Sequence, residues 1–222
     1  MSSIKLKHSG GNSVSLNPPT SAPTSTEVAF KLPNSDGSAN QVIKTDGSGN
    51  LSFVGAGGTT EYDAWVITSD FTTDASSPDY MNSNWTRLDL GNNLFEKIGT
   101  GMTQSSGIFT FPSTGKYQIN AEWSLYANNQ TDGNVLGSIF ATHNGSAGSP
   151  TWTRVSRASI SVTGTNIYNL SSQAMIDVTD VSEIKVRLAS DSSNGVTFLG
   201  ADYSTGIGAM RTGIIFKKIA ET

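Results

Sequence analysis

The stretch Tyr117-Gln-Ile-Asn-Ala-Glu-Trp-Ser-Leu125 decides the fold, because its odd-numbered residues are apolar and its even-numbered residues are polar. Side chains of a β-strand point alternately to opposite faces, so this period of two predicts a strand with one buried face. Tyr117 and Trp123 then lie on the buried face. A second layer of structure must cover that face.

Apolar runs on both sides of this stretch predict further strands. Gly, Asn, Ser or Pro separates nearly all of them, and many short strands at this spacing indicate an all-β sandwich or barrel. No helix is expected, although residues 180–184 can hold a single turn. The expected strands are residues 65–67, 94–98, 108–111, 135–141, 160–162, 167–178, 184–188, 196–199 and 213–219.

The composition agrees with short strands joined by turns. Charged residues make up only 14% of the 222 residues, and 23 glycines with many Ser, Thr and Asn supply the polarity. These residue types are poor helix formers and good turn formers. Hydrophobic residues at 36% suffice for a core, which argues against wholesale disorder.

Charge and cysteine content exclude several functional classes. The net charge of −4, with scattered Lys and Arg, argues against nucleic-acid binding. No apolar run approaches the roughly 20 residues that a membrane helix needs. Residues 1–8 lack the apolar stretch of a signal peptide, and the absence of cysteine excludes disulfides and thiolate metal sites. We expect a protein made and folded in a cytoplasm, with no cofactor.

The chain divides into three parts by apolar content. Residues 1–54 carry small apolar clusters between Gly, Pro and Asp-Gly turns, which predicts hairpins too thin to be stable alone. Residues 55–61 form a Gly-rich joint, and residues 62–222 form the larger β body. The first part therefore requires sister chains or a larger body to dock on. Its candidate docking residues are Ile4, Leu6, Val14 and Leu16.

Catalytic and metal-binding patterns are weak. His8 and His143 lie in polar segments, whereas a Ser-His-Asp triad needs a buried, oriented histidine. Neighbouring acids could support glycan hydrolysis, but acids in turns usually bond their own backbone. We expect no enzymatic activity. The acid pairs considered are Asp70 with Asp74 and Asp177 with Asp180.

The loop at residues 46–50 and two aromatic residues each have both a structural and a binding interpretation. Residues 46–50, Asp-Gly-Ser-Gly-Asn, resemble a calcium loop without its distal glutamate, so a hairpin turn is favoured. Trp152 and Tyr203 lie in polar connections, where an aromatic ring can stack on a sugar. They are the candidate ligand contacts, and packing between subunits is the alternative interpretation. Trp65 and Trp123 are expected in the core.

Residues 93–98 and 106–124 resemble the centre of a C1q/TNF-like domain. The resemblance covers about residues 65–219. Within this range, residues 174–188 are similar to the family's penultimate hairpin, and residues 197–200 and 213–216 are similar to its two closing strands. It implies a ten-stranded jelly roll that forms tight trimers, although no signal peptide or collagen-like stalk is seen here. The central family pattern is matched by Gly107, Phe109, Pro112, Gly115 and Tyr117.

The resemblance predicts that Phe109 and Phe111 face inward, with Pro112 and Gly115 forming the corner between their strand and the next. Periodicity alone leaves open whether the larger apolar residues lie in the sandwich core or at a trimer axis. The candidates for either location are Phe109, Phe111, Tyr117, Trp123, Phe198 and Phe216.

The first part of the chain resembles phage structural proteins. Residues 37–53 are similar to a linker element of phage tail and head fibres, which often precedes a carboxy-terminal knob, and residues 3–13 are similar to the openings of marine-phage structural proteins. These resemblances predict a virion-surface homotrimer, made in the host cytoplasm. Its other partners would be capsid, portal or tail proteins, with a host surface glycan or protein as a further candidate.

Three functional classes follow. The first is a short fibre or spike of a tailed bacteriophage, whose arm anchors to the particle and whose knob faces the host. The second is a trimeric capsid decoration protein, or head fibre. The third is a secreted C1q- or TNF-like ligand.

Overall fold

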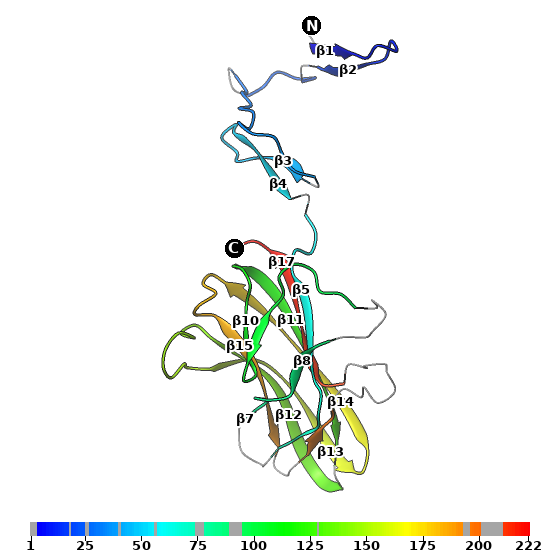
Figure 1. Ribbon diagram of the computed structural model, residues 1–222, viewed down its shortest axis with the longest axis vertical. Helices are drawn as coiled ribbons and strands as arrows, with labels where there is room; N and C mark the ends of the chain where they lie inside the picture. Colours follow the sequence, from blue (N-terminus) through cyan, green and yellow to red (C-terminus); the bar gives the residue numbers. More distant parts are fainter. Residues whose placement is uncertain are drawn as a thin grey trace. The chain divides into compact units, whose positions relative to one another are not determined.

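Figure 1 shows the computed structural model of the chain. Its contacts divide the chain into two compact units, the arm (Met1–Gly57) and the knob (Gly58–Thr222). Within the ranges that the structure describes, every regular element is a β-strand. These ranges are residues 4–17, 19–24, 27–39, 41–55, 57–73, 78–88, 95–127, 129–192, 196–200 and 211–222.

From Gly115 onward the strands of the knob are long, except the two-residue β16, and before Gly115 only β5 is longer than three residues. The short strands contain two or three residues, too few for a periodic signal. The strands are β5 (Tyr62–Ile67), β6 (Phe71–Thr72), β7 (Asp79–Tyr80), β8 (Trp85–Arg87), β9 (Thr103–Ser105), β10 (Ile108–Thr110), β11 (Gly115–Tyr126), β12 (Gln130–Thr142), β13 (Thr153–Gly164), β14 (Ile167–Val178), β15 (Lys185–Ser192), β16 (Thr197–Phe198) and β17 (Gly213–Ala220).

These strands form two antiparallel sheets. One sheet has the order β13-β12-β15-β10-β9, with β7 also paired to β15. In the other, β11 pairs with β14 on one side and with β17 and β16 on the other, and β5 and β8 follow β17. Successive long strands mostly switch sheets, which gives a jelly-roll sandwich. The predicted fold class is therefore confirmed.

β11 shows why the sandwich forms. Its inward side chains, from Tyr117 to Leu125 at every second position, are all fully buried, while Lys116 and Glu122 on the other face are exposed. The strand pairs along its whole length with β14. The alternation thus predicts the buried face correctly.

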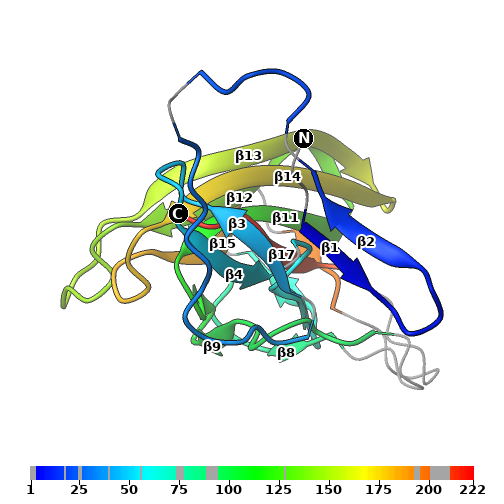
Figure 2. The same ribbon diagram turned by 90° about the horizontal axis from the view of Figure 1, so that it is seen from above.

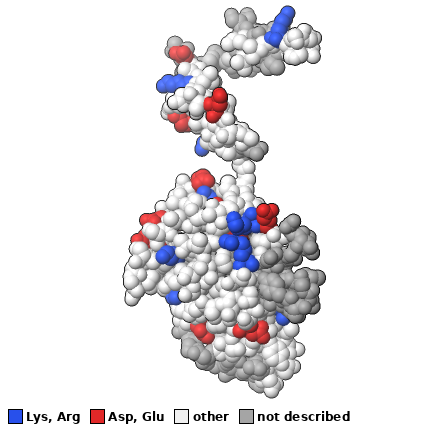
Figure 3. Space-filling view, in the orientation of Figure 1, with Lys and Arg blue, Asp and Glu red and all other residues white. Residues whose placement is uncertain are grey.

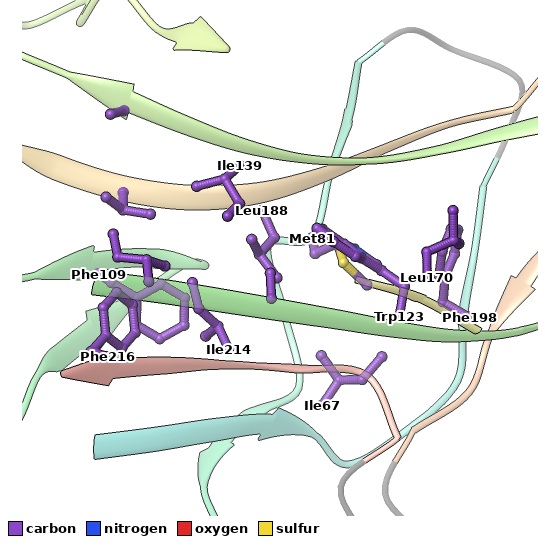
Figure 4. Close-up of a cluster of buried hydrophobic side chains, with 14 of the residues drawn as sticks. Ile67, Met81, Phe109, Trp123, Ile139, Leu170, Leu188, Phe198, Ile214 and Phe216 are labelled. Atoms are coloured by element: carbon purple, nitrogen blue, oxygen red, sulfur yellow. The ribbon is translucent and has the colours of Figure 1, made fainter. Parts of the chain in front are cut away.

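The core lies between the two sheets (Figure 4). Phe109 and Phe216 pack with ring centroids 5.2 Å apart, and Trp65 packs edge-on against Phe109 at 5.8 Å. Trp65 belongs to the core only in part, because it is half-buried, whereas Trp123 is fully buried. The ring of Trp123 lies directly against Gly137, which leaves no space for a side chain there.

The corner between β10 and β11 contains the residues that carry the C1q-like resemblance. Gly115 has φ +141°, and a Cβ at this position would overlap Lys218. The Tyr117 hydroxyl donates to the Ser113 carbonyl oxygen at 3.1 Å and so fixes the turn. The glycine is required here by its backbone conformation and by the close approach of β17.

The arm consists of two hairpins within the residues described. β1 (Ile4–Lys7) pairs with β2 (Ser13–Leu16), and β3 (Gln41–Thr45) pairs with β4 (Leu51–Gly55). The predicted Gly and Asp-Gly turns close both hairpins. An isolated two-stranded hairpin is at best marginally stable in water.

Two expectations, one about a hairpin and one about a strand, are wrong. Residues 174–178 and 184–188 do not form a hairpin, because β14 pairs with β11 and β15 pairs with β12 in the opposite sheet. Alternation predicts which face is buried but not which strand is the neighbour. Residues 95–98 form no strand; Ile98 makes a single bridge to Tyr62, and Gly99 at φ +76° ends the pairing. Leu94 lies outside the described residues.

The turn expected at residues 180–184 is present: the amides of Glu183 and Ile184 donate hydrogen bonds to the Asp180 carbonyl oxygen at 3.3 and 2.9 Å. It lies in the connection through which the chain passes from one sheet to the other.

Candidate binding surfaces

The aromatic residues proposed for the core or a trimer axis all lie inside the sandwich of one chain. Each is at most 2% exposed, so none is available to a partner. Their packing partners come from both sheets. These residues are Phe109, Phe111, Tyr117, Trp123, Phe198 and Phe216.

The histidines and acids considered for catalysis lie apart from buried sites. His8 and His143 are exposed, and His8 Nδ1 accepts a hydrogen bond from the Gly10 amide at 3.1 Å. Asp70 accepts from the Gly200 amide at 2.9 Å, while Asp74 lies outside the described residues. Hydrogen bonds from the Ser182 hydroxyl and amide lower the pKa of Asp180, the opposite of the shift that a general acid needs.

The loop at residues 46–50 has the geometry of a hairpin turn. The Asp46 carboxylate accepts hydrogen bonds from the Ser48 amide at 2.8 Å and from the Asn50 side chain and amide. These bonds, chiefly the one from the Asn50 side chain, lower the pKa of Asp46. Among the residues described, no group of three or more His, Cys, Asp or Glu is placed to hold a metal ion.

A buried carboxylate, Asp63, serves the packing of the knob. It accepts from Arg87 Nε at 2.8 Å, from Trp65 Nε1 at 2.9 Å and from the Met102 amide at 2.8 Å. Through these hydrogen bonds, Asp63 joins β5 to β8 and to the segment before β9. Sequence patterns did not identify this group, because its partners lie up to 39 residues away.

The arm exposes three of the four apolar residues proposed for docking. Ile4, Leu6 and Leu16 are 65%, 66% and 68% exposed, and Ile4 lies opposite Leu16 in the hairpin. The backbone of Val14, the fourth, pairs with that of Leu6. Cross-strand neighbours and alternate residues of one strand lie on the same face of a hairpin, so Ile4, Leu6 and Leu16 share one exposed apolar face.

A second apolar surface follows β13 and β14, which lie side by side at one edge of the sandwich with β8 and β9 at the opposite edge (Figure 2). Each is the last strand of its sheet in the described structure and contains 12 residues. Ile160, Tyr168 and Ile176 are half-buried core residues at this edge. On β14, Ile167 and Met175 are 61% and 64% exposed.

Trp152, the candidate ligand contact, lies on the outer face of the sheet that contains β12 and β15. It is half-buried, and the Arg187 guanidinium carbon lies 3.9 Å from its ring centroid. The same guanidinium carbon lies 3.2 Å from the ring centroid of Tyr80. Tyr203 lies outside the described residues. Arg187 and Tyr80 were not identified from the sequence; the polar positions of β15 are the signal that could have indicated an outward-facing arginine.

Charge is sparse on the knob. On the face of the knob seen in Figure 3, most of the surface is neither acidic nor basic; one small group of basic side chains lies beside acidic ones, and the other charged side chains are scattered. This surface offers no basic track for a nucleic-acid backbone. Nowhere in the described ranges does a helix have the length and hydrophobicity needed to cross a membrane.

Comparison with known proteins gives no family assignment: no family model and no curated protein matches the chain. Among solved structures, an Eiger TNF from S. frugiperda has 12% sequence identity and a TM-score of 0.46, covering 72% of this chain and 93% of its own. Murine APRIL at pH 5.0 has 11% identity and a TM-score of 0.48, covering 71% of this chain and 98% of its own. Likeness at this level of identity concerns the fold alone.

Proposed function

We propose that the chain is a non-enzymatic structural protein of a tailed bacteriophage. Three copies form a short fibre or spike on the virion surface. The arm anchors each copy to a capsid, portal or tail protein, and the knob faces the host. The resemblance of residues 37–53 to phage fibre linkers supports the location, and the two-unit organisation of the chain suits it.

The β13–β14 edge of the knob carries the argument for self-association. Free strand edges expose unpaired N–H and C=O groups, and natural proteins keep such edges short or protect them with charges or proline. Here both edge strands are long, and β14 carries Asp177 as its one charged residue. A sister subunit at this edge would cover the exposed Ile167 and Met175 together with the half-buried core residues behind them.

The number three rests on the resemblance of residues 107–117 to C1q/TNF-like domains, which mostly form trimers. A cyclic trimer gives every copy the same contact and closes on itself, so that no edge remains free. Burial of apolar area at about 25 cal/mol per Å² is the driving force for such contacts.

Light scattering of the full chain at micromolar concentration tests the assembly, with a trimer as the expected mass. Met175→Lys with Ile167→Lys should dissociate it and leave the thermal unfolding of the subunit cooperative, because both side chains are exposed in the single chain. The matched control is Ile98→Lys, which alters an exposed isoleucine bridged to β5 and should leave the trimer intact. A well-folded monomer of the unaltered chain would overturn the proposal.

The position of labelled copies on purified particles separates the fibre from its alternative. Copies restricted to the tail or to single vertices support a fibre, whereas copies spread over the whole shell identify a decoration protein. Purified protein that neither binds host cells nor blocks infection would contradict the host-facing role. Abundant protein in particle-free secretions would instead favour a secreted ligand.

A further inference from the structure

The guanidinium of Arg187 contacts two aromatic rings on the outer face of the knob. Its β15 neighbours Val186 and Leu188 point into the core and are fully buried, so Arg187 points to the opposite face. The guanidinium carbon lies 3.2 Å from the Tyr80 ring centroid and 3.9 Å from that of Trp152. The contacts with both rings, together with a hydrogen bond to the Tyr80 side chain, hold the group in place, and its other N–H groups are the remaining contact points.

The positive charge of Arg187 has no carboxylate partner among the residues that the structure describes. The other stacked arginines are compensated: Arg87 pairs with Asp63 at 2.8 Å and Arg154 with Asp191 at 2.7 Å. Arg187 Nε is buried and makes no hydrogen bond to the described chain. Burial lowers the pKa of this guanidinium, although an arginine stays charged at neutral pH.

The surrounding side chains continue this aromatic surface. The rings of Tyr80 and Phe140 meet edge-on with centroids 5.4 Å apart, and the Arg154 guanidinium carbon lies 5.1 Å from the Phe140 centroid. Arg154 is itself held by Asp191. Two guanidinium groups therefore stack on one continuous set of rings contributed by β7, β12 and the residue before β13.

We propose that Tyr80, Phe140, Trp152, Arg154 and Arg187 form a binding site for an anionic sugar. The carboxylate or phosphate of the sugar would accept hydrogen bonds from Arg187, and its ring would lie against Trp152. A partly buried cation without an anionic partner is costly, and two oxygens of a carboxylate or phosphate match the N–H geometry of a fixed guanidinium. The proposal rests on the proposed host-facing role, because it names the chemistry that the knob recognises.

The test is titration calorimetry on the full chain with three soluble probes. Trigalacturonic acid presents carboxylates, mannose 6-phosphate presents a phosphate, and neutral maltotriose is the control. We expect an acidic probe to bind and maltotriose not to bind; which acidic probe binds identifies the anionic group. Arg187→Met should weaken binding about 10- to 100-fold, as loss of a charged hydrogen bond does.

Arg157→Met is the matched control, because it removes the same charge from an exposed arginine of β13. It should leave the affinity unchanged within about twofold, since a single exposed charge contributes little. Trp152→Phe, which keeps a ring, should lose less affinity than Trp152→Ala. Equal losses for Arg157→Met and Arg187→Met, equal binding of maltotriose, or no binding of either acid would overturn the proposal. The fibre role is tested separately, by the position of labelled copies on the particle. Failure of the sugar site in calorimetry can therefore be distinguished from failure of the fibre role.

Discussion

Replacement of Gly137 by alanine tests the packing at the centre of the knob. Gly137 lies on β12, and a Cβ built on it would lie 2.5, 2.7 and 2.8 Å from three ring atoms of Trp123 on β11. These atoms belong to a fused ring rather than to the end of a flexible chain. The ring cannot move aside locally, because Trp123 is fully buried between the sheets.

The expected cost follows from this overlap. Extra volume forced into a close-packed core costs about 1–3 kcal/mol. An alanine also restricts the unfolded chain, which offsets about 0.4–1 kcal/mol of that cost. For a domain of this size, 1 kcal/mol corresponds to about 2–4 °C in Tm. The net cost is therefore at most about 2.6 kcal/mol, and we expect Gly137→Ala to lower the Tm of the knob by up to about 10 °C.

The assay is thermal unfolding of the full chain followed by circular dichroism at a fixed protein concentration. Gly148→Ala is the control, because a Cβ there has no atom within 4 Å. Its Tm should equal that of the unaltered chain or exceed it by up to about 4 °C, since the alanine restricts the unfolded chain without an overlap in the folded one. In a Trp123→Leu background the added methyl group has space, so Gly137→Ala should cost at least about 1 kcal/mol less than in the unaltered chain. Equal costs in the two backgrounds, or a Gly137→Ala variant as stable as Gly148→Ala, would refute the reasoning.

Three further substitutions probe the rest of the fold. Asp63→Asn should destabilise the knob by about 2–4 kcal/mol in urea unfolding, because it leaves Arg87 without its anion, whereas Asp177→Asn, at an exposed acid, should have no measurable effect. Gly107→Ala should also lower the Tm, since Gly107 has φ +74° and a Cβ there would overlap the Met81 carbonyl oxygen. Asp46 should titrate below its ordinary pKa by NMR, and Asn50→Ala should raise that pKa. Its contribution to the arm is then complete above the unfolded-state pKa and is lost as the pH falls through the lower folded-state pKa; an unshifted titration would contradict the hairpin geometry.

Long alternating stretches were the part of the fold that the sequence predicted well. The strand expected at residues 167–178 coincides with β14, and the alternation from Tyr117 to Leu125 identifies the buried face of β11. The glycine and proline signals also placed the corner before β11 and both arm hairpins correctly. In each case the information is local, so a window of about ten residues contains it.

The remaining features depend on residues far apart in the chain. β6 is recognisable only through its pairing with β16, more than 100 residues later, because two residues have no periodicity. The chain passes from one sheet to the other between β14 and β15, because β14 pairs with β11 and β15 pairs with β12. The Arg187 site brings together Tyr80, Phe140 and Trp152 from three separate segments. No local pattern contains such a juxtaposition, and only the sheet register creates it.

The proposed assembly surface and the proposed sugar site use different faces of the knob. The first follows the β13–β14 edge and the exposed side of β14, whereas the second lies on the outer face of the other sheet, around β15 and β7, and includes β13 only through Arg154. We expect a trimer formed through the exposed side of β14 to leave Arg187 accessible in every copy. Three weak sites on one rigid body bind a polymeric surface far more tightly than one, because each later contact is intramolecular. Dissociation by Met175→Lys with Ile167→Lys should thus abolish adhesion to a polygalacturonate surface, while the calorimetric affinity for trigalacturonic acid stays unchanged. If both fall together, the two surfaces are not independent.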